Sequence, residues 1–351
     1  ELHDSLGGEP DASAFRLIAA RQEPRPPNQS AQSTVAPIVS DRVPQAQSAT
    51  GSKRLTGEVA FVFGSAAAAY PGMGKELLWA FPELWERLIQ QCPIMAASAD
   101  WFDPQQAAAT RTIQQRLHGS SLLSQFHVLL AQQILELQPA AYLGISSGES
   151  NALMACGAWS EMGELLQRLD DTELFTRHVG GQFESVRAAW GLKPNEPVDW
   201  TGFVVRAPLD SVRQALASEP RVHLAMICSP RDCMIAGDAA GCRRVIQRIG
   251  TTEAVESDYR LAVHVPELVP VAALWKQVHT LPTAAAKSVR GRVYGNGPGR
   301  DYTPTSEAAA EAILQQAVQT VDFPKIIERA WADGVRVFVE LGPRDLCSRW
   351  I

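Results

Sequence analysis

The sequence is poor in the residue patterns that metal-binding and nucleic-acid-binding proteins need. Its six cysteines include no Cys-x-x-Cys pair, and its seven histidines show no matching spacing. We therefore predict no metal site and reduced cysteines, as in a cytoplasmic protein. The 32 Lys and Arg residues are outnumbered by 38 Asp and Glu, and no dense basic stretch is present. Because phosphate neutralisation requires clustered positive charge, we exclude a primary role on nucleic acid.

Long apolar runs are also missing. No run approaches the ~20 residues of a membrane span, and no basic-then-apolar leader is visible, so we expect neither a membrane segment nor a signal peptide. The chain of 351 residues is 46% hydrophobic and 20% charged, which is typical of a globular protein. It opens at Glu1 without a methionine, and we interpret it as a segment of a longer polypeptide.

Residues 1–55 differ from the rest of the chain. Pro, Gln, Ser, Ala and Thr dominate residues 22–52, where no hydrophobic period is present. Such a stretch buries too little apolar area to offset its ordering entropy, so we predict a flexible linker or tail over 1–55. Residues 15–20 are the one part of it that could dock against a folded body.

The remaining residues carry the pattern of an α/β protein. Residues 58–63 predict a buried strand, which a turn of small residues at 64–69 follows. An apolar helix is predicted over 122–137 and a second buried strand over 140–145, which a turn rich in Ser and Gly joins to another helix. Strand, tight turn and helix in this order are typical of α/β domains.

Residues 199–259 predict a second, smaller unit. Their pattern of elements is β-α-β-β-α-β, the arrangement of ferredoxin-like folds. We therefore predict that residues 56–198 and 260–351 form one large α/β subdomain, into which this small subdomain is inserted.

The sharpest chemical signal is Gly144-Ile145-Ser146-Ser147-Gly148, between a predicted strand and a predicted helix. In a nucleophile elbow of this pattern the serine occupies a strained turn, and a side chain at either glycine would collide with the neighbouring strand or helix. The turn would expose the hydroxyl of Ser146 at a helix N-terminus and leave the N–H of Ser147 for an oxyanion. The alternative is that Ser146 only caps the helix.

A nucleophilic serine requires a base, because a hydroxyl is hardly ionised at neutral pH. His264 is the candidate, since it lies where the chain re-enters the large subdomain, and a junction of this kind is where a ligand site is expected. The alternative is a core histidine bonded to the backbone. No Asp or Glu follows the elbow as a convincing third member, so we predict a dyad steadied by a backbone carbonyl.

Several separated motifs resemble those of one family, in that family's order. The matching segments are Phe61-Val62-Phe63, Tyr70-Pro71-Gly72-Met73-Gly74, Gly144 to Glu149, Ser229-Pro230 with Gly237-Asp238, Val263-His264-Val265-Pro266, Tyr294 to Gly299, Val321-Asp322-Phe323 and Val337 to Pro343. Over residues 57–351 the chain resembles the acyltransferase domains of malonyl-CoA:acyl carrier protein transacylases and of polyketide and polyunsaturated fatty acid synthases. The resemblance implies an α/β-hydrolase-like core with an inserted ferredoxin-like subdomain.

The resemblance also implies a ping-pong acyl transfer. Ser146 would attack the thioester of acyl-CoA with His264 as general base, and the phosphopantetheine thiol of an acyl carrier protein would then take the acyl group. Backbone N–H groups of Ser147 and Ala66 would form the oxyanion hole. No cofactor is implied beyond these substrates, and the other partners would be neighbouring domains of a megasynthase.

The sequence departs from the family's pattern around the predicted site. Residues 65–69 are Ser-Ala-Ala-Ala-Ala where the family usually has Gly-Gln-Gly-Ser-Gln, Ile145 replaces a histidine, and Cys228 replaces an asparagine. We predict that Ile145 and Cys228, together with Val263 and Gln125, contact the substrate.

Selection of a malonyl group depends on an arginine in this family, since a guanidinium pairs with the free carboxylate. An ungapped count from Ser146 reaches Asp171, whereas a short insertion places Arg177 in register, with Arg168 as a poorer fit. We therefore predict that Arg177 binds the carboxylate of malonyl-CoA, against the alternative of an ordinary solvated arginine.

Three functions from different classes follow from these residues. The first is malonyl-type transfer to a carrier protein. The second is a thioesterase that uses the same Ser-His dyad, motivated by the missing Gln and His side chains. The third is a non-catalytic module that docks a carrier protein, motivated by the alanines at 66–69.

Overall fold

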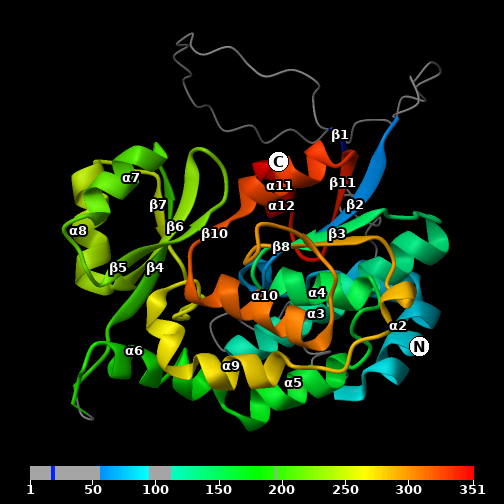
Figure 1. Ribbon diagram of the computed structural model, residues 1–351, viewed down its shortest axis with the longest axis horizontal. Helices are drawn as coiled ribbons and strands as arrows, with labels where there is room; N and C mark the ends of the chain where they lie inside the picture. The colour runs from blue at the N-terminus through cyan, green and yellow to red at the C-terminus, as the bar shows by residue number, and fades with distance from the viewer. Residues whose placement is uncertain (1–16, 20–55, 95–111, 194–195) are drawn as a thin grey trace, which may run out of the picture.

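The structure is a computed structural model that describes residues 17–19, 56–94, 112–193 and 196–351. Its strands form two sheets (Figure 1), a larger one in the order β1-β11-β2-β3-β8-β9 and a smaller one in the order β10-β5-β6-β4-β7. The predicted α/β fold is confirmed. Of the predicted linker over 1–55, only β1 (Leu17–Ala19) lies within the described residues, and it pairs with β11.

Parallel strands form the centre of the larger sheet. They are β2 (Glu58–Phe63), β3 (Ala141–Gly144), β8 (Arg292–Gly295) and β11 (Val335–Leu341). The antiparallel strands β1 and β9 (Arg300–Tyr302) flank them. These strands have continuous apolar runs because both faces of the sheet are covered, and the predicted strands at 58–63 and 140–145 are confirmed as β2 and β3.

Helices connect the strands throughout the described residues. The α-helices are α1 (Lys75–Ala80), α2 (Pro82–Gln91), α3 (Ile113–Leu129), α4 (Ser147–Ala155), α5 (Met162–Asp171), α6 (Glu184–Ala189), α7 (Leu209–Leu216), α8 (Ala239–Ile249), α9 (Ala272–His279), α10 (Ser306–Val318), α11 (Phe323–Ala332) and α12 (Leu346–Trp350). Short 3-10 or π segments are η2 (Ala66–Ala68), η5 (Leu130–Ile134), η6 (Leu174–His178), η7 (Pro266–Val271) and η8 (Ala286–Ser288). The helix predicted over 122–137 corresponds to the end of α3 and η5. None of the described helices is long and apolar enough to cross a membrane.

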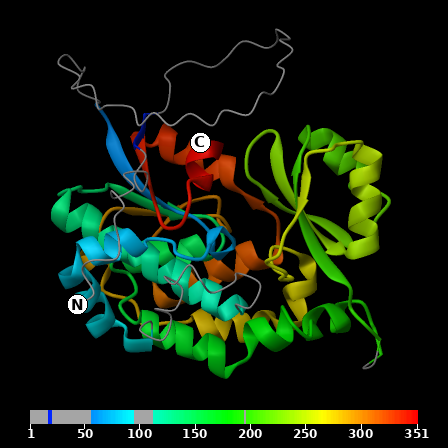
Figure 2. The same ribbon diagram turned by 180° about the vertical axis from the view of Figure 1, so that it is seen from behind.

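The helices cover the two faces of the larger sheet in two layers (Figures 1 and 2). Because side chains alternate along a strand, Phe61 of β2 packs into a hydrophobic cluster with α3, α4 and α10, whereas Val62 packs into a second cluster with α11 and α12. Helix α4, which follows the turn after β3, packs in the larger of the two clusters, on the α3 and α10 side of the sheet.

The smaller sheet stands beside the larger one. It contains β4 (Trp200–Arg206), β5 (Val222–Ile227), β6 (Asp232–Asp238) and β7 (Ala254–Glu256), joined by antiparallel pairing, with α7 and α8 packed on one face. The chain order β4-α7-β5-β6-α8-β7 is the predicted one. A fifth strand, β10 (Val321–Asp322), pairs in parallel with β5 and comes from outside residues 199–259. The sequence-based boundary therefore omits one strand of this sheet.

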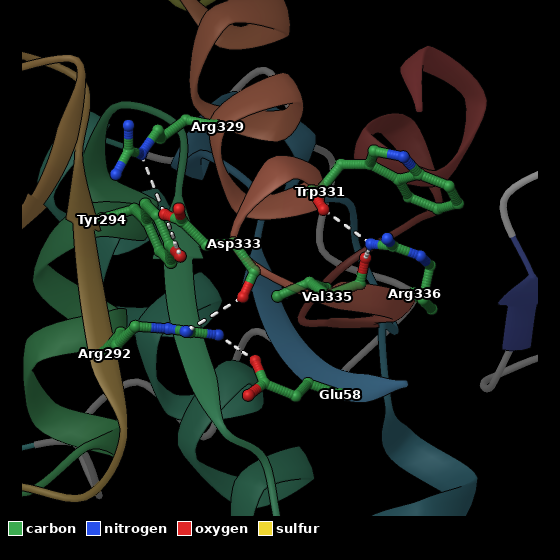
Figure 3. Close-up of polar contacts among 8 residues, drawn as sticks. All are labelled: Glu58, Arg292, Tyr294, Arg329, Trp331, Asp333, Val335 and Arg336. Atoms are coloured by element: carbon green, nitrogen blue, oxygen red, sulfur yellow. Dashed lines mark hydrogen bonds and ion pairs between the residues drawn. The ribbon is translucent and has the colours of Figure 1, made fainter. Parts of the chain in front are cut away.

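A polar network closes the edge of the larger sheet at which the parallel strands begin (Figure 3). Arg292 at the start of β8 pairs with Glu58 at the start of β2 and donates to the carbonyl oxygen of Asp333 at 3.1 Å. The carboxylate of Asp333 accepts from Tyr294 at 3.0 Å and from Arg329 at 2.9 Å. Ligand sites of parallel α/β sheets lie at the opposite edge, where the strands end, and that edge carries the turn between β3 and α4.

Candidate active site

Ser146 occupies a strained turn between β3 and α4. Its backbone has φ 58° and ψ −125°, a conformation that residues with a Cβ rarely adopt. A Cβ on Gly144 would lie 2.2 Å from the carbonyl carbon of Gly148, and a Cβ on Gly148 would lie 2.1 Å from the carbonyl oxygen of Phe63. The close approach of these backbones requires glycine at both positions, as the predicted elbow demands.

The hydroxyl of Ser146 makes no capping hydrogen bond to α4. Its Oγ lies 2.8 Å from Nε2 of His264, a residue 118 positions away. Nδ1 of the same ring lies 2.6 Å from the main-chain carbonyl oxygen of Gln316. A carbonyl oxygen only accepts, so Nδ1 carries the imidazole proton and Nε2 accepts the hydroxyl proton of Ser146. The structure thus brings both predicted dyad residues together, with a backbone carbonyl behind the imidazole.

Burial controls the protonation of His264. The residue is 4% exposed, and burial lowers the pKa of its imidazole to about 4, while the hydrogen bond to the backbone of Gln316 raises it. The imidazole is therefore neutral at pH 7, which is the state in which Nε2 can accept a proton. The backbone of His264 is also constrained, with φ 64° and its N–H 2.6 Å from the carbonyl oxygen of Ala317.

Gln316, which the sequence analysis missed, contacts both members of the dyad. Its carbonyl oxygen accepts from His264, and its side-chain Nε2 donates to the carbonyl oxygen of Ser146 at 3.2 Å. It lies on α10, three residues after Ile313, and both side chains are buried. The sequence offers one signal for Gln316, which is a polar residue on the apolar face of a predicted helix. Such a residue needs hydrogen-bond partners when it is buried.

The two predicted oxyanion donors lie next to each other, but only one of them already has a hydrogen-bond acceptor. The N–H of Ser147 is at the start of α4, and no described residue accepts from it. The N–H of Ala66, in contrast, donates to Oγ of Ser147 at 2.9 Å. The main chain of η2 therefore reaches the elbow as predicted, yet its N–H is occupied by a side chain.

An apolar cavity opens beside the dyad, between α3, α4, α5, α9 and α10. It is a narrow cavity with a volume of about 60 Å³. Its lining is formed by Leu117, Ser121, Ser146, Ser147, Ser150, Asn151, Met154, Met162, Leu165, Leu166, Leu169, Phe175, Tyr259, Leu261, Val263, His264, Trp275, His279, Ile313, Gln316 and Ala317. Among the described residues, no Lys, Arg, Asp or Glu lines it.

Arg177, the predicted carboxylate-binding residue, lies outside this cavity. It is on η6, and its guanidinium donates to Glu184 at 2.8 Å and lies 3.7 Å from Glu173. Its side chain is 48% exposed. Arg168, the poorer candidate, pairs with Glu164 and also does not line the cavity. Surface carboxylates thus hold the guanidinium of Arg177, and its expected role in carboxylate binding stays a prediction.

Of the four other predicted substrate-binding residues, only Val263 lines the cavity. Ile145 faces the opposite side of the sheet, where it packs in the cluster that includes α11. Cys228 is buried at the end of β5, away from the lining. Gln125 lies behind the cavity wall and donates to the carbonyl oxygen of Asn151 at 3.1 Å. Ile145, Cys228 and Gln125 thus do not line this cavity, and their contact with a substrate stays a prediction.

A buried carboxyl group supports the elbow from behind. Oε2 of Glu149 accepts from the main-chain N–H and from Nδ2 of Asn296, both at 3.0 Å. The same Nδ2 donates to the carbonyl oxygen of Gly144 at 2.6 Å. Burial raises the pKa of Glu149 to about 7, against the hydrogen bonds from Asn296. These contacts tie the start of α4 to the residue that follows β8.

The described residues contain no group of three or more His, Cys, Asp or Glu side chains placed to hold a metal ion. The groups that the site presents next to the apolar cavity are a hydroxyl, a neutral imidazole and backbone N–H groups.

The chain is similar in sequence to segments of megasynthases. It is 23% identical over 311 residues to one of the subunits of a polyunsaturated fatty acid synthase of Thraustochytrium sp., a match that covers 82% of this chain and 15% of that protein. It is 26% identical over 311 residues to a polyketide synthase of Streptomyces halstedii, covering 85% of this chain and 5% of that protein. The chain thus spans a small part of the length of these relatives. No model of a known protein family matches it.

Solved structures extend the similarity to the fold. A malonyl-transacylase in complex with its type II polyketide synthase carrier protein gives a TM-score of 0.69 at 17% identity, covering 84% of this chain and 91% of that one. The acyltransferase domain from the second module of the salinomycin polyketide synthase gives 0.67 at 21% identity, covering 84% and 66%. The chain has the fold of these acyltransferases. Its homologues are synthase segments and its structural neighbours are acyltransferases, which confirms the resemblance stated from the motifs.

Proposed function

We propose that this chain transfers an acyl group from acyl-CoA, through an ester on Ser146, to the phosphopantetheine thiol of an acyl carrier protein. The observation that carries the proposal is the 2.8 Å hydrogen bond from Ser146 Oγ to Nε2 of His264, beside the apolar cavity. The fold similarity to a transacylase solved with its carrier protein supports the second substrate.

In the first half-reaction, Nε2 of His264 takes the hydroxyl proton of Ser146 as Oγ bonds to the thioester carbonyl carbon. The carbonyl electron pair moves onto oxygen, where the N–H of Ser147 and the positive end of α4 stabilise the charge. The tetrahedral intermediate then expels the CoA thiolate, which takes the proton from the imidazolium. The carbonyl oxygen of Gln316 holds the proton on Nδ1 throughout.

The second half-reaction runs the same steps in reverse. The carrier thiol gives its proton to His264, and its sulfur attacks the acyl-Ser146 ester. When the ester C–O bond breaks, the imidazolium returns a proton to Oγ of Ser146. A base that is neutral at pH 7 serves both halves, because it is regenerated each time.

We further propose that the acyl group is uncharged, in place of the malonyl group expected from the sequence. No charged described residue lines the cavity, so a malonyl carboxylate would lose its hydration there without gaining a cation. An aliphatic chain would instead bury against side chains such as Met154, Leu166 and Phe175. Arg177 is held by Glu184 at the surface and does not alter this.

Intact-mass spectrometry tests the proposal. The purified chain is incubated with acetyl-, butyryl-, octanoyl-, palmitoyl- and malonyl-CoA, and we expect acyl adducts from the uncharged thioesters, with malonyl-CoA giving less. Ser146→Ala should remove the adduct, whereas Ser160→Ala, on an exposed loop, should keep it. A folded wild-type chain that forms no adduct with any of them contradicts the proposal.

A holo acyl carrier protein then separates the three candidate functions. Acyl-carrier product that forms faster than free acid indicates transfer. Faster release of free acid identifies a thioesterase on the same dyad. Binding of the carrier without any adduct on Ser146 identifies a docking module. The hydrogen-bonded dyad beside an apolar cavity favours the first outcome over the third.

As a classification, we propose an α/β-hydrolase-like large subdomain over 56–198 and 260–351 with an inserted ferredoxin-like subdomain over 199–259. The antiparallel order β5-β6-β4-β7 and the β-α-β-β-α-β sequence of elements support the second part. We also propose that the chain works beside other domains of a cytoplasmic megasynthase. The synthase relatives support this context, and the six cysteines, all of them buried and none in a disulfide among the described residues, agree with a reducing compartment.

A further inference from the structure

The hydroxyl of Ser147 connects the main chain of η2 to the elbow. Its Oγ accepts from the main-chain N–H of Ala66 at 2.9 Å, a contact across 81 positions that joins η2 to the first residue of α4. Ser147 lines the cavity together with Ser146. The N–H of Ala66 therefore faces the reacting region with a hydroxyl oxygen already bound to it.

The hydroxyl of Ser147 has one proton of its own to donate. Because Oγ accepts from Ala66, the O–H hydrogen points away from that N–H, and no described residue accepts it. A hydroxyl that accepts from an amide is polarised and becomes a better donor. The N–H of Ser147 likewise has no acceptor among the described residues. One residue thus offers two donors beside the nucleophile.

We infer that Ser147 is a second catalytic serine. Its hydroxyl acts as a relay, because it accepts a hydrogen bond from the Ala66 N–H and donates one to the oxyanion that develops on the substrate. The inference rests on the proposed acyl transfer at Ser146. As Ser146 Oγ bonds to the carbonyl carbon and its proton moves to His264, the carbonyl oxygen gains the charge and accepts from both the N–H and the O–H of Ser147. The O–H bond of Ser147 stays intact, and the charge leaves with the thiolate when the C–S bond breaks.

A competing interpretation predicts the opposite change in the acylation rate when the Ser147 hydroxyl is removed. If the Ser147 hydroxyl only blocks the Ala66 N–H, its removal would open a backbone donor to the oxyanion and speed acylation. If it relays, its removal leaves the oxyanion with one donor fewer. The direction of the change in rate therefore decides between the two.

The test measures the rate constant for acyl-Ser146 formation in rapid-quench experiments with octanoyl-CoA, followed by intact mass. We expect Ser147→Ala to lower this rate constant by ~10 to 100-fold with little change in the half-saturating concentration, because the lost contact exists mainly in the transition state. Ser147→Thr and Ser147→Val have the same shape and differ only in the hydroxyl, so we expect Thr to react faster than Val by a similar factor.

A second experiment removes the Ala66 N–H, which donates to the Ser147 hydroxyl. Ala66→Pro removes the N–H, and the ψ of 163° at Ser65 is the conformation that a residue before proline adopts. A relay predicts that combining Ala66→Pro with Ser147→Ala costs no more than the slower single variant. Two independent oxyanion donors would instead give multiplicative losses.

The outcomes separate this inference from the proposed function. A wild-type chain that is never acylated overturns the acyl transfer and the relay with it. A wild-type chain that is acylated, with Ser147→Ala as fast or faster, or with Thr and Val equal, overturns the relay alone. If Ser147→Ala does not fold, the Thr and Val pair carries the test.

Discussion

The carbonyl oxygen of Gln316 lies 2.6 Å from Nδ1 of His264 and takes the place that a carboxylate has in a catalytic triad. It fixes the tautomer and the ring orientation, but it carries no full charge to stabilise an imidazolium. Burial lowers the pKa of His264 to about 4, against the hydrogen bond to this carbonyl, and this has a measurable consequence for the reaction.

The rate constant for acylation should stay nearly constant from about pH 8 down to about pH 5 and fall as the pH drops through about 4. The base acts in its neutral form, and burial lowers its pKa from 6.5 to about 4, so the active form persists to lower pH than for an ordinary histidine. Rapid-quench acylation after pH jumps measures this. An acidic limb near 6.5 would contradict it.

Gln316→Met should slow acylation by about 10-fold and lower stability by about 1 kcal/mol. Methionine keeps the size of the side chain but leaves the carbonyl oxygen of Ser146 without its donor. The backbone carbonyl that holds His264 is retained, so the pH profile should not change. Gln319→Met, on an exposed position after the same helix, serves as the control. Equal rates in both variants would show that this side chain does not position the elbow.

Gly148→Ala should destabilise the protein by about 3 kcal/mol or more, or prevent folding. Its Cβ would lie 2.1 Å from the carbonyl oxygen of Phe63, which belongs to a central strand and cannot move away. Gly163→Ala in α5 is the matched control, since its Cβ would make only ordinary contacts from 3.7 Å outward. The control should be neutral or more stable by about 0.5 kcal/mol. Thermal and denaturant unfolding compare the two.

Arg177→Ala should leave the preference among acyl-CoA substrates unchanged. The guanidinium is half exposed and bonds to Glu184, outside the cavity. Competition between malonyl- and butyryl-CoA for acylation of Ser146 measures the preference in the wild type and the variant. A shift toward butyryl-CoA in the variant would restore the role that the sequence predicted for this arginine.

Glu149→Gln should change how stability depends on pH. Burial raises the pKa of this carboxyl group from 4.5 to about 7, so the folded state holds its proton more tightly than the unfolded state. The stability that this group contributes is present below pH 4.5 and is lost as the pH rises through 7, on the order of 3 kcal/mol over the whole range.

The neutral amide in Glu149→Gln does not titrate, so the variant lacks this pH-dependent contribution to stability. The free energy of unfolding of the variant minus that of the wild type should therefore rise between pH 5 and 7.5. Glu253→Gln makes the same change at an exposed position and serves as the control. Urea unfolding across this pH range measures both. A flat difference for Glu149→Gln would show that the carboxyl group titrates normally.

The sequence predicted well those features that depend on local pattern. The strand at 58–63 has the predicted bounds, because an apolar run bounded by turn residues is a local signal. The pairing of Ser146 with His264 was also predictable, because few histidines were available and one lay at the junction of the two subdomains.

Other features depend on the three-dimensional course of the chain, which no local pattern reports. Arg177 could be placed in register by a gap, but its pairing with Glu184 required the course of the chain through η6. Ile145 follows a strand residue, and the face that it occupies depends on how the elbow twists. The contact between Ala66 and Ser147 joins residues 81 positions apart, and only the folded chain shows that the N–H is already occupied.

Within the proposed large subdomain, the residues around the base and those around the nucleophile pack against different sheets. Ala262 and Val265, on either side of His264, pack with Trp200 of the smaller sheet, whereas Ser146 is anchored to the centre of the larger one. Helix α10, which holds the imidazole, continues into β10 of the smaller sheet. Proton transfer from Ser146 to His264 therefore depends on the packing between the two sheets. A variant that weakens this packing should lose its acylation activity while both sheets stay folded. An inactive chain with an unchanged melting transition would therefore indicate that Ser146 and His264 have moved apart, rather than that a catalytic group is lost.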